Sequence, residues 1–107
     1  MASIGVPKEI KADELRVALT PDGAKELVNQ GLEVLVESKA GDGAGIKDEA
    51  FAQAGAKIVS QREAWSAHLI VKVKEPQEEE FEFLRQDMVL FTYLHLAAYP
   101  RVGEALI

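Results

Sequence analysis

The sequence contains no cysteine and only two histidines among its 107 residues. The absence of cysteine excludes disulfide bonds and thiolate metal ligands, and it fits a reducing compartment. Two histidines that lie far apart in the chain make a poor metal site. We therefore expect a cytoplasmic protein without a bound metal.

Long apolar runs and clusters of basic residues are also lacking. No stretch approaches the roughly 20 apolar residues that a membrane-spanning helix needs, and no signal-peptide pattern follows Met1. The 12 basic residues are scattered and are outnumbered by 18 acidic ones, which gives a net charge of -6. Neither a membrane nor a nucleic acid is therefore expected as a partner.

The length and hydrophobic content match one small domain. A chain of 107 residues, 48% of them hydrophobic, buries roughly 65% of its unfolded surface. That permits a modest core and excludes a complete two-domain enzyme.

Strand-like and helix-like segments alternate along the chain. Strands are predicted at 3–6, 32–36, 58–59, 69–73 and 88–93. Helices are predicted between Thr20 and Gly31, around Asp48 to Ala54, after the Ser60 and Glu63 capping box, and from Glu78 to Arg85. This alternation predicts an α/β fold, a Rossmann-like open parallel sheet with flanking helices.

The last segments predict an incomplete domain. The apolar run from Met88 to Phe91 is typical of a central strand covered on both faces, so strands beyond it are expected from further sequence. A helix is predicted to begin at Pro100, but the sequence stops at Ile107, before the three turns of an average helix. We expect a truncated chain.

Three polar residues follow predicted strands. Arg16 lies in the loop after the first strand, Lys74 ends the fourth and His95 follows the last. In a parallel sheet they converge at the carboxyl edge, where ligands bind in open α/β folds. A guanidinium, an ammonium and an imidazole suit a small anion with a reactive carbonyl, such as a 2-oxo acid.

Each of these residues also has a structural explanation. Arg16 can pair with a nearby acid on the surface, Lys74 can be a solvated strand end, and His95 can be a hydrogen-bonded core residue. His68 precedes a strand at the opposite edge, where a structural or solvated role is expected. Gly41, Gly43 and Gly45 are assigned to a turn. The acidic run of Glu78, Glu79, Glu80 and Glu82 is assigned to a solvated helix start. The hydrophobic core is expected to contain Phe81, Phe83, Met88 and Phe91.

Four motifs resemble the alanine dehydrogenase family. They are Ile4-Gly-Val-Pro-Lys-Glu9, Arg16-Val-Ala-Leu-Thr-Pro21, Val71-Lys-Val-Lys-Glu-Pro76 and Phe91-Thr-Tyr-Leu-His-Leu-Ala-Ala98. The first three are also similar to the α subunit of the proton-translocating nicotinamide nucleotide transhydrogenase. The fourth block favours alanine dehydrogenase because it supplies the position of the catalytic histidine.

The resemblance implies reversible oxidative deamination of L-alanine to pyruvate and ammonium with NAD. It implies that Arg16 and Lys74 bind the pyruvate carboxylate and carbonyl, that His95 is the general acid and base, and that Tyr93 lies in the pocket wall. Residues 1–107 would be the amino-terminal part of the substrate (catalytic) domain. NAD would bind to a domain outside this chain, and the parent protein would be a homohexamer.

Two other functions remain open at this stage. One is a fragment of the transhydrogenase α subunit, and the other is a non-enzymatic module that binds an oxo acid. We expect the isolated chain to be catalytically silent in either enzyme family, because it has no nicotinamide site.

Overall fold

Short strands and helices alternate in the computed structural model, which describes residues 2–10, 14–74 and 76–92. The strands of this part are β1 (Ser3–Val6), β2 (Glu33–Glu37), β3 (Lys57–Val59), β4 (Leu69–Val71) and β5 (Val89–Phe91). The helices are α1 (Pro21–Asn29), α2 (Asp48–Gln53), α3 (Gln61–Trp65) and the 3-10 helices η1 (Asp42–Ala44) and η2 (Glu78–Phe83). The predicted alternation is confirmed.

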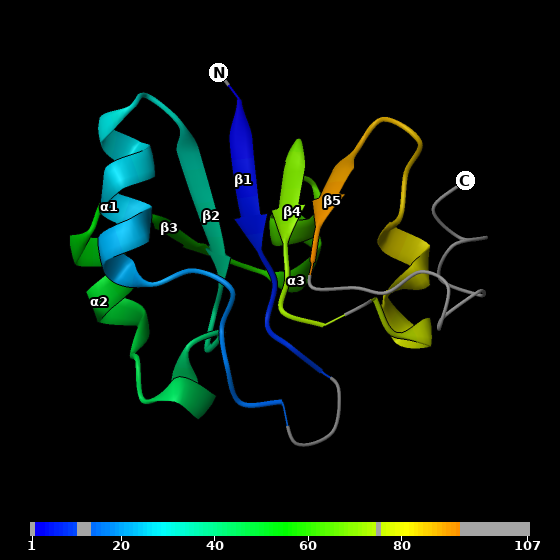
Figure 1. The fold of residues 1–107 in the computed structure, drawn as a ribbon, viewed down its shortest axis with the longest axis horizontal. Helices are drawn as coiled ribbons and strands as arrows, with labels where there is room; N and C mark the ends of the chain where they lie inside the picture. The colour runs from blue at the N-terminus through cyan, green and yellow to red at the C-terminus, as the bar shows by residue number, and fades with distance from the viewer. Residues whose placement is uncertain (1, 11–13, 75, 93–107) are drawn as a thin grey trace.

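The strands form one parallel sheet in the order β3-β2-β1-β4-β5 (Figure 1). β2 pairs with one side of β1, and β3 pairs with β2. The chain then returns across the sheet, and β4 pairs with the other side of β1. The point between β1 and β4 is therefore the topological switch of a doubly wound sheet. The predicted α/β fold with an open parallel sheet and flanking helices is confirmed.

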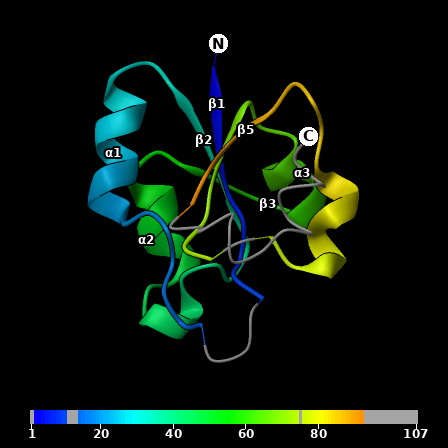
Figure 2. The same cartoon turned by 45° about the vertical axis from the view of Figure 1, so that its right-hand side comes forward.

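Helices lie on both faces of the sheet (Figure 2). With α1 and α2 on one face, the buried residues of that layer are Val6, Ala24, Val34, Val36, Ala40, Phe51 and Ala56. The face covered by α3 and η2 has a second core of Trp65, Ala67, Ile70 and Phe83. Leu35 packs against this second core while its neighbours in β2 face the first, as the two-residue period of a strand requires.

The helix ends follow the capping signals in the sequence. Thr20 caps α1 by accepting a hydrogen bond from the Gly23 amide at 3.1 Å, and Pro21 occupies the first turn. Gly31 follows the helix with a φ of 90°, the left-handed conformation that glycine adopts at low cost.

None of the helices in the described part has the length and apolarity needed to cross a membrane.

The last strand differs from its prediction. In the described residues β5 is an edge strand, which leaves the strands expected beyond it untested, and Val89 and Phe91 are 62% and 60% exposed, so a core role for Phe91 is wrong in this chain. Phe91 is paired with Val71, which packs against the first core, so Phe91 and Val89 lie on the sheet face that α1 covers at β2. Leu90 points to the other face and packs against the second core.

The segment after β4 is also different from the expected α-helix. Residues Glu78–Phe83 form a 3-10 helix, and Phe83, not Phe81, is its buried aromatic residue. Its ring stacks on Trp65 with 5.6 Å between ring centroids. The tighter three-residue period aligns Phe83 with Glu80, so both side chains turn inward.

Gly5 permits the close contact between β1 and α3. A β-carbon at this position would lie 2.0 Å from the Ala64 carbonyl oxygen, so the Gly5→Ala variant must displace α3. We expect a loss of about 2–3 kcal/mol in the free energy of unfolding, measured with urea on the 107-residue chain. Gly31→Ala is the contrast, because nothing lies near its β-carbon and only backbone strain of about 1–2 kcal/mol is added. A Gly5→Ala loss no larger than that of Gly31→Ala would contradict the steric argument.

Candidate functional site

The loops that follow β1 and β4 meet at the carboxyl edge of the sheet, below the strands in Figure 1. They carry Arg16 and Lys74, two of the residues predicted to converge there. His95 and Tyr93 lie outside the described residues. The structure therefore describes the cationic part of the predicted site.

Arg16 forms a bidentate ion pair with Glu14. Its Nε and Nη2 each donate to a carboxylate oxygen at 3.0 Å, and its backbone N–H donates to the same carboxylate at 2.9 Å. The Arg16 side chain is 67% exposed, whereas that of Glu14 is only 5% exposed. The ion pair that the sequence offered as the structural explanation of Arg16 is thus present. It also fixes the guanidinium at the mouth of the site, with Glu14 contacting two of its five N–H donors.

Glu14 remains ionised well below neutral pH. Hydrogen bonds from Arg16 are the largest cause and lower the pKa of Glu14 from 4.5 to about 2, although burial opposes them. The positive charge of Lys74 adds to this lowering, which places Lys74 within electrostatic range of Glu14. The site therefore has two cations and one fixed anion at neutral pH.

The low pKa of Glu14 is testable by titration. We expect the Glu14 carboxyl carbon of the 107-residue chain to titrate near pH 2 in NMR, and to return towards 4.5 in Arg16→Gln. Because the folded pKa is below the unfolded value, this group stabilises the fold above about pH 4.5, and the contribution is lost as the pH falls towards 2. A Glu14 titration that is unchanged in Arg16→Gln would contradict the assigned cause.

Lys74 is half-buried at the end of the segment that follows β4. Its backbone N–H donates to Glu9 Oε1 at 3.2 Å. The prediction that Lys74 is only a solvated strand end is therefore incomplete, because its main chain is tied to the loop after β1.

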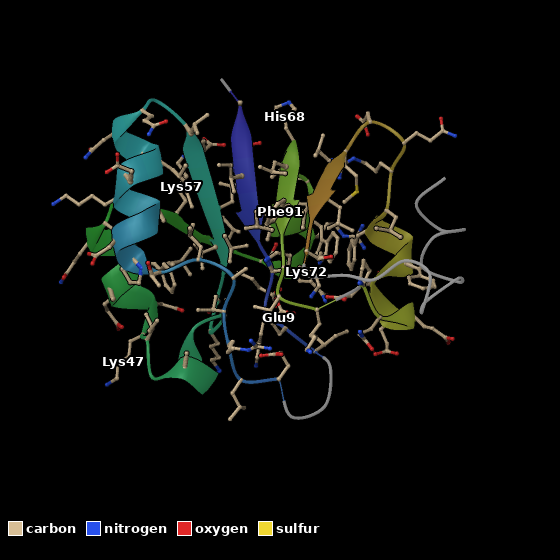
Figure 3. The ribbon with its side chains drawn as sticks, viewed as in Figure 1. Glu9, Lys47, Lys57, His68, Lys72 and Phe91 are labelled. Carbon is tan, nitrogen blue, oxygen red and sulfur yellow. The ribbon has the colours of Figure 1, made fainter. Side chains whose placement is uncertain are left out.

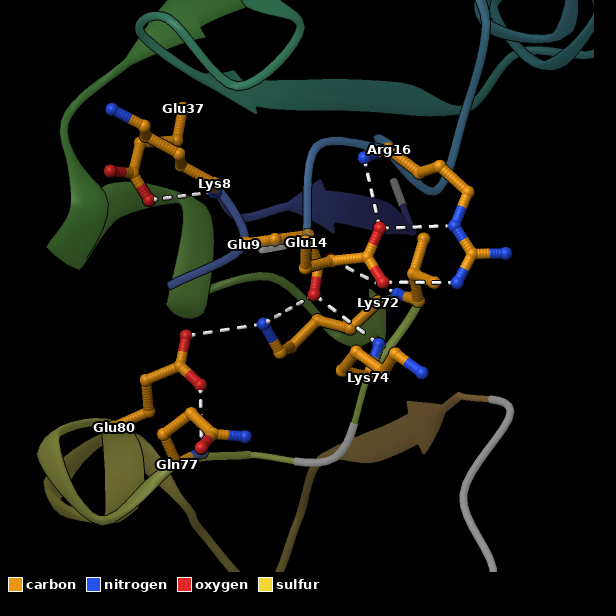
Figure 4. A network of polar contacts seen from close by, with 10 residues as sticks. Lys8, Glu9, Glu14, Arg16, Glu37, Lys72, Lys74, Gln77 and Glu80 are labelled. Atoms are coloured by element: carbon orange, nitrogen blue, oxygen red, sulfur yellow. Dashed lines mark hydrogen bonds and ion pairs between the residues drawn. The ribbon is translucent and has the colours of Figure 1, made fainter. Parts of the chain in front are cut away.

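A buried ion cluster lies beside Lys74 (Figure 4). Lys72 Nζ donates to Glu9 Oε1 at 3.1 Å and to Glu80 Oε2 at 3.2 Å. The three side chains are 1%, 2% and 0% exposed, respectively. Lys72 also lies over the Trp65 ring, with its nitrogen 6.0 Å from the ring centroid. Sequence reasoning missed this cluster, although one signal was present: Lys72 interrupts an apolar run at a position that shares a face with buried Ile70.

The solvated role assigned to Glu80 is wrong. Glu80 is fully buried, and its Oε1 accepts the Gln77 amide at 2.9 Å while its other oxygen contacts Lys72. Burial raises the pKa of Glu80, and the charge of Lys72 opposes that shift. Glu78, Glu79 and Glu82 match the solvated or partly solvated positions predicted for this run.

A surface hollow of about 350 Å³ adjoins Arg16. It is lined by residues from the loops after β1, β2 and β4, namely Arg16, Val17, Ala18, Thr20, Ala44, Ile46 and Val73. Hollows of this size hold small organic ligands. The glycine turn thus contributes Ala44 to a wall of the site, a role that its sequence did not indicate.

The glycine segment 41–45 and the start of α2 do not fit the pyrophosphate of a dinucleotide. The segment 41–45 forms a turn and a three-residue 3-10 helix, as the turn assignment predicted, and the following α2 begins with Asp48 and Glu49. Asp48 accepts hydrogen bonds from Ser38 Oγ at 2.9 Å and the Lys39 amide at 2.8 Å. The Asp48 carboxylate at the start of α2 repels a pyrophosphate.

The described residues contain no group of three or more acidic, histidine or cysteine side chains that could hold a metal ion.

His68 lies at the opposite edge of the sheet from Glu9 (Figure 3). Its Nδ1 accepts a hydrogen bond from the Ser3 amide at 3.2 Å and lies 3.0 Å from Ser3 Oγ. These contacts join the starts of β1 and β4, so the structural role expected for His68 is confirmed.

Comparisons with known proteins show which family this chain resembles. Alanine dehydrogenase from Bacillus subtilis is 53% identical over 104 residues, and the one from Geobacillus stearothermophilus is 49% identical over 106 residues. These matches include 96% and 97% of this chain, which spans 28% of the length of each relative.

Solved structures give the same result. One L-alanine dehydrogenase has a TM-score of 0.94 at 50% identity, covering 97% of this chain and 29% of its own. A transhydrogenase from Sinorhizobium meliloti has a TM-score of 0.90 at 29% identity, covering 97% of this chain and 31% of its own. The family model described as "Alanine dehydrogenase/PNT, N-terminal domain" matches residues 5–107. This chain therefore belongs to the alanine dehydrogenase/PNT N-terminal domain family.

Proposed function

We propose that this chain is the amino-terminal, substrate-binding part of an NAD-dependent alanine dehydrogenase, which interconverts L-alanine and pyruvate with ammonium. The observation that carries the proposal is the placement of Arg16 and Lys74 at the switch point of the sheet, where Arg16 and Val73, the residue before Lys74, line a hollow of about 350 Å³. Identity of 53% to the Bacillus subtilis alanine dehydrogenase, against 29% to the transhydrogenase, favours this activity over hydride transfer coupled to proton movement.

The charges of the site suit a monoanionic substrate. Arg16 and Lys74 contribute two positive charges, and Glu14, ionised because of its low pKa, contributes one negative charge. Apart from the buried cluster of Lys72, Glu9 and Glu80, these three groups leave one excess positive charge, which matches the carboxylate of pyruvate. Arg16 binds that carboxylate, and Lys74 holds the carbonyl oxygen and stabilises charge that develops on it.

The remaining roles fall on residues outside the described part. In this proposal His95 is the general acid and base for proton transfer at the substrate, and Tyr93 forms part of the pocket wall. NAD, which supplies the hydride chemistry, binds to a domain outside this chain, in line with the poor fit of residues 41–49 to a pyrophosphate. The parent protein is proposed to be a cytoplasmic homohexamer.

The first experiment is to read the coding sequence downstream of Ile107 and to assay the encoded full-length protein. Oxidation of NADH with pyruvate is expected to require ammonium, with sodium chloride at equal ionic strength as the control. The isolated 107-residue chain is expected to be inactive. Hydride transfer between nicotinamide nucleotides without ammonium would support the transhydrogenase alternative. Saturable pyruvate binding without catalysis by the full-length protein would support a binding module.

A further inference from the structure

We propose that Glu9 is a positioning residue for Lys74, which it holds through the main chain. This inference rests on the proposed function, in which Lys74 contacts the substrate. Glu9 does not reach the substrate in this scheme. Its carboxylate fixes the backbone from which the Lys74 side chain extends.

The contacts of Glu9 converge on one short segment. Glu9 Oε2 accepts the Val73 amide at 3.0 Å, and Oε1 accepts both the Lys74 amide at 3.2 Å and Lys72 Nζ at 3.1 Å. One carboxylate therefore binds three consecutive residues at the carboxyl end of β4. Hydrogen bonds to a charged acceptor are stronger than those between neutral groups, so this carboxylate restricts the backbone of residues 72–74 more than a neutral acceptor would.

The backbone geometry explains why a side chain is needed here. Pairing between β1 and β4 is limited to Ile4 with Leu69 and Gly5 with Ile70, and β1 ends at Val6, where Pro7 follows. The amides of Val73 and Lys74 consequently have no strand carbonyl of β1 opposite them. Glu9 supplies the acceptor that the ended strand lacks.

The surroundings of Glu9 restrict its movement. Its side chain is 2% exposed, and the Lys72 ammonium bridges it to the buried Glu80. The preceding residue, Lys8, donates its amide to Glu37 at the end of β2 at 2.9 Å (Figure 4). The segment with Glu9 is thus held on both sides, and displacement of its carboxylate would leave Lys72 with one carboxylate partner.

A double-mutant cycle in the full-length protein separates positioning from general stability. Glu9→Gln keeps one acceptor oxygen and removes the charge. We expect it to lower kcat/KM for pyruvate roughly 10- to 100-fold, the range for a small misplacement of a reacting group. In the Lys74→Ala background the same change is expected to have almost no further effect, because the group that Glu9 positions is gone.

Glu80→Gln is the matched control. It alters the same buried cluster but leaves all hydrogen bonds from the Val73 and Lys74 amides in place. It is expected to lower the urea midpoint without changing kcat/KM. If Glu9→Gln does not fold, Glu9→Asp enters the same cycle, since the shorter carboxylate keeps the charge and cannot reach both amides.

The outcomes distinguish this inference from the proposed function. Equal losses from Glu9→Gln with and without Lys74, in a wild-type protein that shows ammonium-dependent activity, would overturn the positioning role alone. A wild-type protein without that activity would overturn the proposed function and this inference with it. A loss from Glu9→Gln that appears only in the protein that keeps Lys74, and not in the Lys74→Ala background, supports both.

Discussion

Replacing Lys74 by alanine in the full-length protein is expected to lower kcat for reductive amination of pyruvate about 10²–10⁴-fold. The ammonium is proposed to stabilise charge on the substrate oxygen as the reaction proceeds. Its removal therefore costs more in the transition state than in the bound substrate. Steady-state assays with pyruvate, ammonium and NADH, each varied in turn, give kcat and KM separately.

Lys25→Ala is the matched control for this substitution. Lys25 is an exposed lysine on α1, and alanine is well accommodated in a helix. Both variants lose one positive charge, but only one loses it at the switch point of the sheet. Near-normal kcat in Lys74→Ala would remove this residue from the mechanism, whereas equal losses in the two variants would point to a long-range effect of charge.

The local elements could be predicted from the sequence because their determinants lie close together in the chain. Thr20 and Pro21 start α1, and the Ser60 and Glu63 capping box starts α3, each through contacts three residues apart. The position of Lys74 at the carboxyl edge followed from one more rule, since parallel strands place their ends at the same side of the sheet.

The choice between two roles of one residue could not be made from the sequence. Arg16 could pair with a neighbouring acid on the surface or bind a carboxylate ligand, and the sequence left both roles possible. The structure shows the first contact, to Glu14, two residues away. Periodicity carries no information about which partner a guanidinium selects, because both are carboxylates and both are allowed by the loop.

Long-range polar contacts were beyond the reach of sequence patterns for a different reason. Lys72 pairs with Glu9 across 63 positions, and only the docking of two strand ends brings them together. Glu80 belongs to an acidic run that is typical of a solvated helix start. Its burial depends on the 3-10 geometry of η2 and on Lys72, the residue after β4, which offsets the lost hydration.

The substitution with the largest expected effect on stability is therefore Lys72→Met in the 107-residue chain. Methionine has a similar length, but it leaves Glu9 and Glu80 without their shared cation in the interior. Removing one partner from a buried ion cluster typically costs about 3–5 kcal/mol, a large part of the stability of a small domain. Urea unfolding at pH 7 measures the loss in the free energy of unfolding, which is obtained from both the midpoint and the denaturant slope m.

The pH dependence identifies the source of that loss. Burial raises the pKa of Glu80, and Lys72 opposes the shift, so the carboxyl group should protonate more readily in Lys72→Met. A group with a raised pKa in the folded state favours folding below its unfolded pKa, and this contribution is lost as the pH rises through the folded pKa. The deficit of Lys72→Met relative to wild type is accordingly expected to shrink as the pH is lowered from 7 towards 5.

A second substitution separates charge from packing. In Lys72→Met/Glu80→Gln the glutamine oxygen still accepts the Gln77 amide, but no carboxylate remains unpaired at this position. The double variant is expected to be more stable at pH 7 than Lys72→Met and to lack most of its pH dependence. If both variants lose the same stability at every pH, the loss does not come from the unpaired carboxylate of Glu80. The buried lysine would then stabilise the fold through Glu9 or through the packing of its hydrocarbon chain against Trp65.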